Sequence, residues 1–90
     1  MLEISYSRKF VKDIKRLKSN KHYNSEIFKG VVSSLVRGEG LDVKYKDHQL
    51  GGKLENCREC HLKFDLLLIY EVSPNEIRLL RVCTHSELFG

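Results

Sequence analysis

The chain has 90 residues, of which 41% are hydrophobic and 31% are charged, and its net charge is +4. This length predicts a single domain over residues 1–90, and the composition excludes an intrinsically disordered chain. No apolar run is long enough to cross a membrane and no charged-then-apolar leader opens the sequence, so we expect a cytoplasmic protein with no membrane partner. The cysteines are odd in number and lack a secretory context, which predicts reduced thiols.

The first half of the chain predicts one strand followed by two helices. Residues 2–6 alternate between apolar and polar side chains, as a half-buried strand does. Ser7 is a good N-cap for a helix over residues 8–21, where apolar side chains recur at three- and four-residue spacing. A second amphipathic helix starts near residue 24 and ends at Gly38. With little chain between them, the two helices are expected to form a hairpin.

The second half predicts strands. An irregular stretch over residues 38–52 is followed by expected strands at 53–62, 65–72 and 77–83. The middle strand is an uninterrupted apolar run, which is typical of a strand covered on both faces. Short turns require these three strands to pair as an antiparallel meander. The sequence therefore predicts an α+β fold with an N-terminal strand, a two-helix hairpin and a three-stranded antiparallel meander, the helices packing on one face of the sheet.

Positive charge is concentrated in the first predicted helix. Residues 8–21 carry seven basic side chains and one acidic side chain, whereas the rest of the chain carries nine basic and eleven acidic ones. A local excess favours a specific contact with phosphates. A solvated helix face rich in lysine is the alternative that charge alone leaves open. The residues that we expect to make this contact with RNA phosphates are Arg8, Lys9, Lys12, Lys15 and Arg16.

Three histidines and one aspartate are candidates for proton transfer. His48 lies in the irregular stretch, His61 and Asp65 flank a predicted hairpin, and His85 follows the last strand. Such groups, with arginines nearby, are the minimum needed to move protons while RNA is cleaved. A carboxylate that meets an imidazole across a hairpin would orient it, although hairpin-end polar residues also cap backbone groups. The apolar pair just before the C-terminus is expected to dock and to hold His85 in place.

A cysteine motif offers alternatives that we reject. Residues 57–61 read CRECH, which matches the C-x-x-C-H pattern of covalent haem attachment. That chemistry requires export and usually an axial methionine, and Met1 is the only methionine. On a strand, Cys57 and Cys60 point to opposite faces, which disfavours a shared metal or a disulfide. Zinc bound by histidines, Asp65 and a cysteine would need tighter ligand spacing. We therefore expect no metal and no cofactor.

Three segments of the second half resemble a known family. They are residues 45–52 (YKDHQLGG), 58–70 (RECHLKFDLLLIY) and 84–90 (THSELFG). In this order and at these separations they are similar to the YafQ-type branch of the RelE/ParE toxin superfamily. The order and length of the first half fit as well. One departure is Phe64, which stands where the family usually has a proline that would stiffen the hairpin. The resemblance implies a RelE-like fold.

The same resemblance implies the toxin of a bacterial type II toxin–antitoxin system. Such a toxin is a ribosome-dependent mRNA endoribonuclease acting in the A site, and its partners are a cognate antitoxin protein, the ribosome and mRNA. The family's functional positions match His48, His61, Asp65, Arg81, His85 and Phe89.

These residues support a mechanism without metal, in which the RNA 2′-hydroxyl attacks the adjacent phosphate. His85 is expected to be the general acid, and the general base is left open among His48, His61 and Asp65. Arg81 would clamp the phosphate and Phe89 would stack on a base. The alternative is a non-catalytic toxin of the same fold, or a nucleic-acid-binding module, that inhibits its target by binding.

Overall fold

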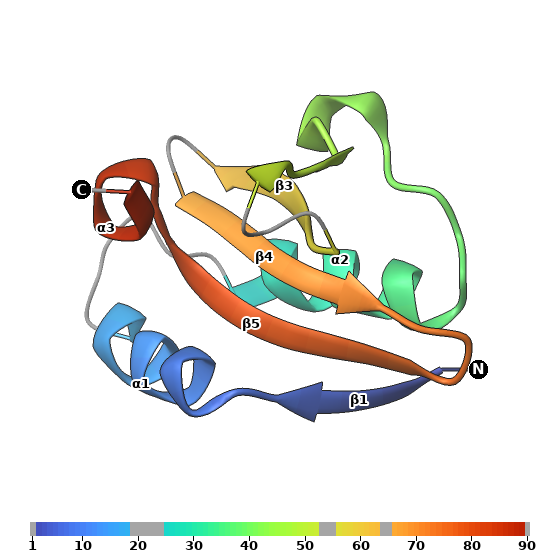
Figure 1. Ribbon diagram of the computed structural model, residues 1–90, viewed down its shortest axis with the longest axis horizontal. Coiled ribbons are helices and arrows are strands. Elements are labelled where there is room, and N and C mark those ends of the chain that lie inside the picture. Colours follow the sequence, from blue (N-terminus) through green and yellow to red (C-terminus); the bar gives the residue numbers. More distant parts are fainter. Residues whose placement is uncertain (1, 19–24, 53–55, 64–65, 90) are drawn as a thin grey trace.

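The computed structural model describes residues 2–18, 25–52, 56–63 and 66–89, and for His85 and Phe89 it describes the backbone only. The predicted α+β fold is confirmed, and the strands of the described chain form one five-stranded sheet in the order β1-β5-β4-β3-β2 (Figure 1). The elements in chain order are β1 (Glu3–Tyr6), α1 (Arg8–Leu17), α2 (Ser25–Val36), the 3₁₀ helix η1 (Val43–Tyr45), β2 (His48–Gln49), β3 (Arg58–Lys63), β4 (Leu66–Val72), β5 (Glu76–Thr84) and α3 (His85–Phe89).

The sheet contains the predicted meander and two further strands at its edges. β3, β4 and β5 pair in antiparallel fashion, as expected. β1 pairs parallel to β5, and β2 pairs antiparallel to β3. The N-terminal strand was therefore predicted, and β2 was not. β2 has only two residues, which is too short for an alternating pattern. It is a strand because it pairs with β3. His48, expected in an irregular stretch, is the first residue of β2.

Element boundaries also differ from the expectation. β3 begins at Arg58 instead of residue 53; Asn56 and Cys57 precede the strand, and residues 53–55 lie outside the described chain. α1 is described to Leu17, so the expected continuation to residue 21 falls largely outside. Ser7 caps α1 as predicted, because its Oγ accepts a hydrogen bond from the Phe10 amide at 3.0 Å. No helix within the described ranges is long and apolar enough to cross a membrane.

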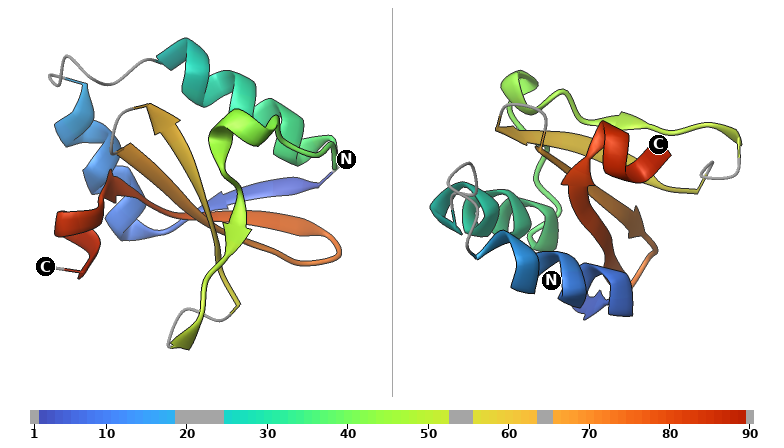
Figure 2. Two further views of the ribbon diagram at one scale, coloured as in Figure 1. Left: turned by 90° about the horizontal axis from the view of Figure 1, so that it is seen from above. Right: turned by 90° about the vertical axis from the view of Figure 1, so that its left-hand side faces the viewer.

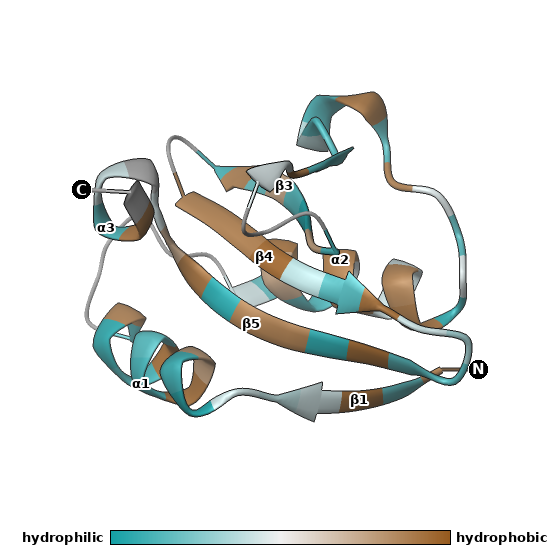
Figure 3. Ribbon diagram, viewed as in Figure 1, coloured by the Kyte–Doolittle hydropathy of each residue, from teal (hydrophilic) through white to brown (hydrophobic). Residues whose placement is uncertain are grey.

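The two faces of the sheet are covered differently. α1 and α2 pack on one face, as predicted, and bury a cluster that includes Phe10, Leu17, Val31 and Leu35. Leu41 and Tyr45, from the segment before β2, pack against this same cluster. α3 lies over the other face (Figure 2). There Leu88 of α3 packs on a second cluster, formed by Cys57, Leu67 and Ile69. β4 is therefore apolar over most of its length (Figure 3), because both of its faces are covered.

Candidate active site

The first row of the candidate site crosses the sheet on the face opposite α1 and α2. His48 on β2 lies opposite Glu59 on β3, Glu59 lies opposite Ile69 on β4, and Ile69 lies opposite Arg81 on β5. Directly opposite residues point to the same face of a sheet. The register alone therefore lines up a histidine, a carboxylate and an arginine over four neighbouring strands.

The second row follows directly beside the first. His61 on β3 lies opposite Leu67, and Leu67 lies opposite Cys83 on β5. Two residues after Cys83, the chain enters α3 at His85. The backbone thus brings the three histidine-bearing segments to one face of the sheet. The side chains of His85 and Phe89, and the whole of Asp65, lie outside the described structure, so the predicted contact between His61 and Asp65 remains a prediction.

A buried carboxylate joins the two described histidines. Glu59 is 2% exposed, and its Oε2 lies 2.9 Å from His48 Nε2 and 3.9 Å from His61 Nε2. The two imidazole rings are 6.3 Å apart between centroids. Sequence reasoning brought the two histidines into the site but missed Glu59. The signal was present, because residues 59 and 61 of one strand must share a face.

Both nitrogens of the His48 ring face oxygen acceptors. Nδ1 lies 2.6 Å from the carbonyl oxygen of Lys46, and Nε2 faces the Glu59 carboxylate. A carbonyl oxygen accepts hydrogen bonds only, and so does an ionised carboxylate. This geometry offers an acceptor to each ring nitrogen, so a doubly protonated His48 could donate two hydrogen bonds here.

The loop that carries His48 is fastened to the sheet by Asp47. Its Oδ1 accepts hydrogen bonds from the Tyr70 hydroxyl at 2.6 Å and from Arg58 Nε at 3.2 Å. Burial, followed by the bond to Asp47, raises the pKa of Tyr70, and the bond to Asp47 raises the pKa of Arg58. Lys46 adopts a positive φ of 50°, which turns the chain between the 3₁₀ helix and β2. These contacts fix the backbone from which His48 projects.

Arg81 is oriented by a buried aspartate of α1. Its Nε and Nη2 donate to the two carboxylate oxygens of Asp13 at 2.7 and 3.1 Å. Asp13 is 2% exposed and also accepts from the amide of Val82 at 3.1 Å. The bond to Asp13 raises the pKa of Arg81, which remains a cation. Arg81 therefore lies at the end of the first row, and nothing in the sequence pattern pointed to the aspartate that holds it.

The basic side chains of α1 are not equivalent. Arg8, Lys9, Lys12 and Lys15 are exposed, as expected for residues that contact RNA. Arg16 instead takes part in ion pairs, with Asp13 at 3.4 Å and with Glu87 of α3 at 3.0 Å.

The three cysteines are free and buried. Cys57 packs in the cluster under α3 and Cys60 in the cluster under α1 and α2, so the predicted opposite facing is confirmed. Burial raises the pKa of the Cys60 thiol to about 12, which keeps it protonated at neutral pH. Within the described ranges, no three His, Cys, Asp or Glu side chains are arranged to hold a metal ion.

Solved bacterial toxins share this fold. The metal-bound toxin from Helicobacter pylori has a TM-score of 0.91 and 46% identity, over 99% of this chain and 100% of that one. The Escherichia coli DinJ–YafQ complex gives a TM-score of 0.89 and 32% identity over the whole of both chains. The E. coli K12 mRNA interferase toxin YafQ is 34% identical over 89 residues, which cover 98% of this chain and 96% of the relative.

The fold is thus that of a bacterial toxin. The family model described as the bacterial toxin of type II toxin–antitoxin systems, YafQ, matches residues 2–90. The chain belongs to the YafQ family.

Proposed function

We propose that this chain is an mRNA endoribonuclease toxin that acts in the ribosomal A site by acid–base chemistry without a metal ion. The observation that carries the proposal is the cluster of His48, Glu59 and His61 on the sheet face to which the backbone brings His85. The E. coli relative is named an mRNA interferase toxin, which agrees with it. The catalytic residues, the acid–base chemistry and the action on the ribosome go beyond that name and are proposed here.

In the proposed reaction, the 2′-oxygen of the RNA forms a bond to the adjacent phosphorus and the bond from phosphorus to the 5′-oxygen breaks. A base takes the proton of the 2′-hydroxyl, and an acid gives a proton to the departing 5′-oxygen. The products are a 2′,3′-cyclic phosphate and a 5′-hydroxyl. His85 is the proposed acid. Both His48 nitrogens face acceptors, so we propose His48 as a cation and His61 or Asp65 as the base.

The cations of the site stabilise the charge that builds up on the phosphate. His48, 2.9 Å from the Glu59 carboxylate, is proposed to supply one positive charge as an imidazolium, and Arg81 supplies a second. Asp13 fixes the plane of the Arg81 guanidinium, which leaves less side-chain entropy to be lost when the phosphate arrives. Phe89 is proposed to stack on a base of the message.

The exposed basic side chains of α1 are the proposed contact with ribosomal RNA. They project from one helix outside the catalytic cluster, so they can bind the rRNA backbone while the message occupies the site. Such contacts position the enzyme and carry no sequence preference. The residues proposed for this role are Arg8, Lys9, Lys12 and Lys15.

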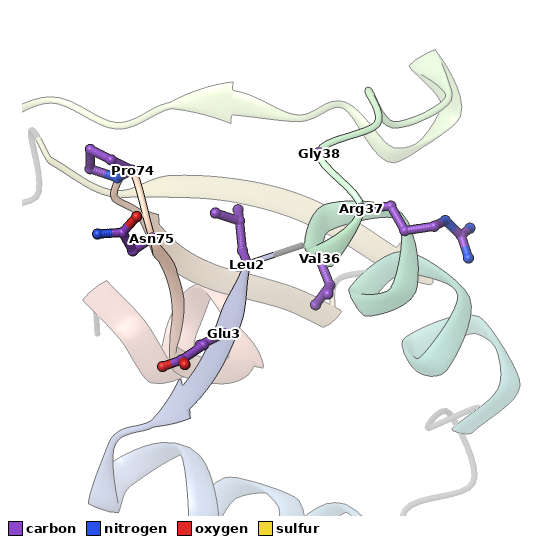
Figure 4. Close-up of a pocket in the computed structure, with 7 residues that line it drawn as sticks. All are labelled: Leu2, Glu3, Val36, Arg37, Gly38, Pro74 and Asn75. Carbon is purple, nitrogen blue, oxygen red and sulfur yellow. The ribbon is translucent and has the colours of Figure 1, made fainter.

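The proposed antitoxin contact is a groove centred on Tyr6. Three cavities of about 400, 310 and 260 Å³ share this residue and run from α2 past β1 to α1. A further cavity of about 840 Å³ continues the groove at Val36 and Arg37, where Leu2 lies between the β4–β5 turn and the end of α2 (Figure 4). Ile4 and Val11 are 37% and 44% exposed beside Tyr6, which is 55% exposed. We call this surface the Tyr6 groove.

The chemistry of the Tyr6 groove favours an acidic amphipathic segment of the antitoxin. Its aliphatic lining suits protein side chains better than phosphates. Every charged residue that lines the three cavities around Tyr6 is cationic, which complements an acidic partner. The E. coli relative is known in complex with its partner DinJ. An occupant of this groove would also cover part of the proposed ribosome contact. The cationic lining residues are Arg8, Lys12, Lys15, Lys18, Lys29 and Arg37.

The decisive experiment compares wild type with His85→Ala on ribosomes programmed with a defined message. Loss of the general acid is expected to slow cleavage by roughly 100- to 10,000-fold, with an unchanged thermal unfolding midpoint. Arg78→Ala is the control. Arg78 is an exposed residue of β5, the strand that leads into α3, and it lies outside the cluster. A folded His85→Ala protein that still cleaves would remove His85 from the mechanism. Growth arrest without any cleavage by wild type would favour the non-catalytic toxin.

A further inference from the structure

We propose that Arg16 and Glu87 are positioning residues that hold α3 for catalysis, and that Arg16 is not an RNA contact. The proposal rests on the proposed function, in which α3 carries the general acid. Arg16 would thus have a different role from the other basic residues of α1, although all of them belong to the same charged segment.

The start of α3 is closed by a reciprocal cap. The amide of Thr84 donates to Glu87 Oε1 at 3.0 Å, and the amide of Glu87 donates to Thr84 Oγ1 at 3.2 Å. This is a capping box, which satisfies two backbone donors that a helix otherwise leaves open. His85 is the first residue of α3, directly after Thr84. The cap therefore fixes the backbone at the residue proposed to donate the proton.

Arg16 ties this cap to the rest of the molecule. Its Nη2 lies 3.0 Å from Glu87 Oε2, the carboxylate oxygen that the Thr84 amide does not use. Its Nη1 lies 3.4 Å from Asp13 Oδ1, and Asp13 in turn holds Arg81. One guanidinium therefore links the cap of α3 to the carboxylate that orients the proposed phosphate clamp.

The solvent exposure of the Arg16–Glu87 pair indicates whether its loss should affect stability or the cleavage rate. The two side chains are 49% and 38% exposed, and pairs this exposed contribute little to stability. Misplacing a catalytic group by about 1 Å, in contrast, can slow a reaction by on the order of 100-fold. Breaking the pair is therefore expected to slow cleavage while the protein stays folded.

The test compares Arg16→Gln, Glu87→Gln, the double variant and Lys15→Gln, which removes an exposed charge one residue away. Glutamine at 87 keeps an oxygen for the Thr84 amide and removes only the charge that attracts Arg16. Message cleavage is measured under single-turnover conditions while the concentration of programmed ribosomes is varied. The measurement gives the saturating rate and the ribosome concentration at which half of that rate is reached. We expect each of the two single variants to lower the rate by about 10- to 100-fold without changing the half-saturating concentration. Lys15→Gln should raise the half-saturating concentration and leave the saturating rate unchanged.

The double variant distinguishes one shared interaction from two separate effects. If the residues act through their ion pair, the double variant is no slower than either single variant. Multiplied effects would contradict the proposal, as would an Arg16→Gln protein that only raises the half-saturating concentration.

Amide hydrogen exchange provides a readout that does not depend on catalysis. Arg16→Gln should accelerate exchange at Glu87, whose amide closes the cap, and Lys15→Gln should not. Unchanged exchange in Arg16→Gln would overturn the positioning role even if wild type cleaves no RNA. Absence of cleavage by wild type, with accelerated exchange in Arg16→Gln, would instead contradict the proposed function alone.

Discussion

At the scale of single residues, buried carboxylates organise the cations of the candidate site. Glu59 lies between His48 and His61, and Asp13 holds Arg81 by two hydrogen bonds. Burying a carboxylate is costly unless it is paired and hydrogen-bonded. Both carboxylates are therefore expected to matter for the charge state and the orientation of their partners more than for direct contact with RNA.

Glu59→Gln tests this division of roles. The glutamine keeps the shape of the side chain but removes the negative charge that pairs with His48. At neutral pH, we expect both ring nitrogens of His48 to be protonated in wild type and only one in the variant, as measured by nitrogen-15 chemical shifts of the imidazole. Cleavage should fall by roughly 10- to 1,000-fold, because one cation is lost beside the phosphate. Two protonated nitrogens in the variant would show that Glu59 does not hold the charge.

The residues of the site were only partly predictable from the sequence. Histidines are visible in any sequence, and the strand register confirms that His48 and His61 share a face. Glu59 was overlooked because an acidic residue in a polar strand is usually solvated, and only the two-residue period of β3 assigns it to the histidine face. Asp13 carries no signal, because its partner Arg81 is 68 residues away in the chain.

At the scale of elements, the segment before β2 is held in place by identifiable hydrogen bonds. Asp42 caps the 3₁₀ helix by accepting from the Lys44 amide at 3.0 Å, and Leu50 donates to the carbonyl of Cys57 at 2.9 Å. Between these points, Asp47 bonds to β3 and β4. A long loop in a small domain is thereby converted into a fixed platform for His48.

Asp47→Ala is expected to loosen this platform. The variant leaves the hydroxyl of Tyr70, a residue 1% exposed, without its acceptor, which should cost about 1–3 kcal/mol of unfolding free energy. Urea denaturation measures this loss. Asp42→Ala, which removes an exposed cap of the same loop, is the control and should cost less. Equal losses in the two variants would mean that Asp47 is only a surface residue.

Two elements could not be foreseen from hydrophobic period, and both lie at the candidate site. β2 is too short to show alternation and exists because β3 offers its edge. α3 is a five-residue helix, which is shorter than any amphipathic period can reveal, and it is fixed by its cap and by Leu88. The T-x-x-E sequence of the capping box was a usable signal. The long strands and amphipathic helices, by contrast, followed from hydrophobic period alone.

At the scale of the whole molecule, positive charge and exposed apolar surface meet on α1. Val11 opens into the Tyr6 groove, and Lys12 and Lys15 line the same groove. Antitoxin and ribosome would therefore compete for one region even if the antitoxin never touched a histidine. Neutralisation of the toxin would then follow from blocked delivery to the ribosome.

A matched pair of variants separates the two partners. Lys12→Glu/Lys15→Glu should weaken binding to ribosomes and to the antitoxin, and the salt dependence of ribosome binding should become shallower, because fewer phosphates are neutralised. Val11→Ser should weaken antitoxin binding alone, since it removes apolar contact and no charge. Sedimentation with ribosomes and calorimetric titration with the antitoxin measure these effects. Ribosome binding that is as strong in the lysine variant as in wild type would remove α1 from the ribosome contact.

The pairing of β1 with β5 joins the first strand of the chain to the last. Glu3 lies opposite Glu76, and Asp13 of α1 accepts a hydrogen bond from Arg81. During synthesis, β1 and α1 emerge long before the strand that completes them, and contacts so distant in sequence form late. The sheet, and with it the proposed phosphate clamp, can therefore be completed only once the final strand has left the exit tunnel.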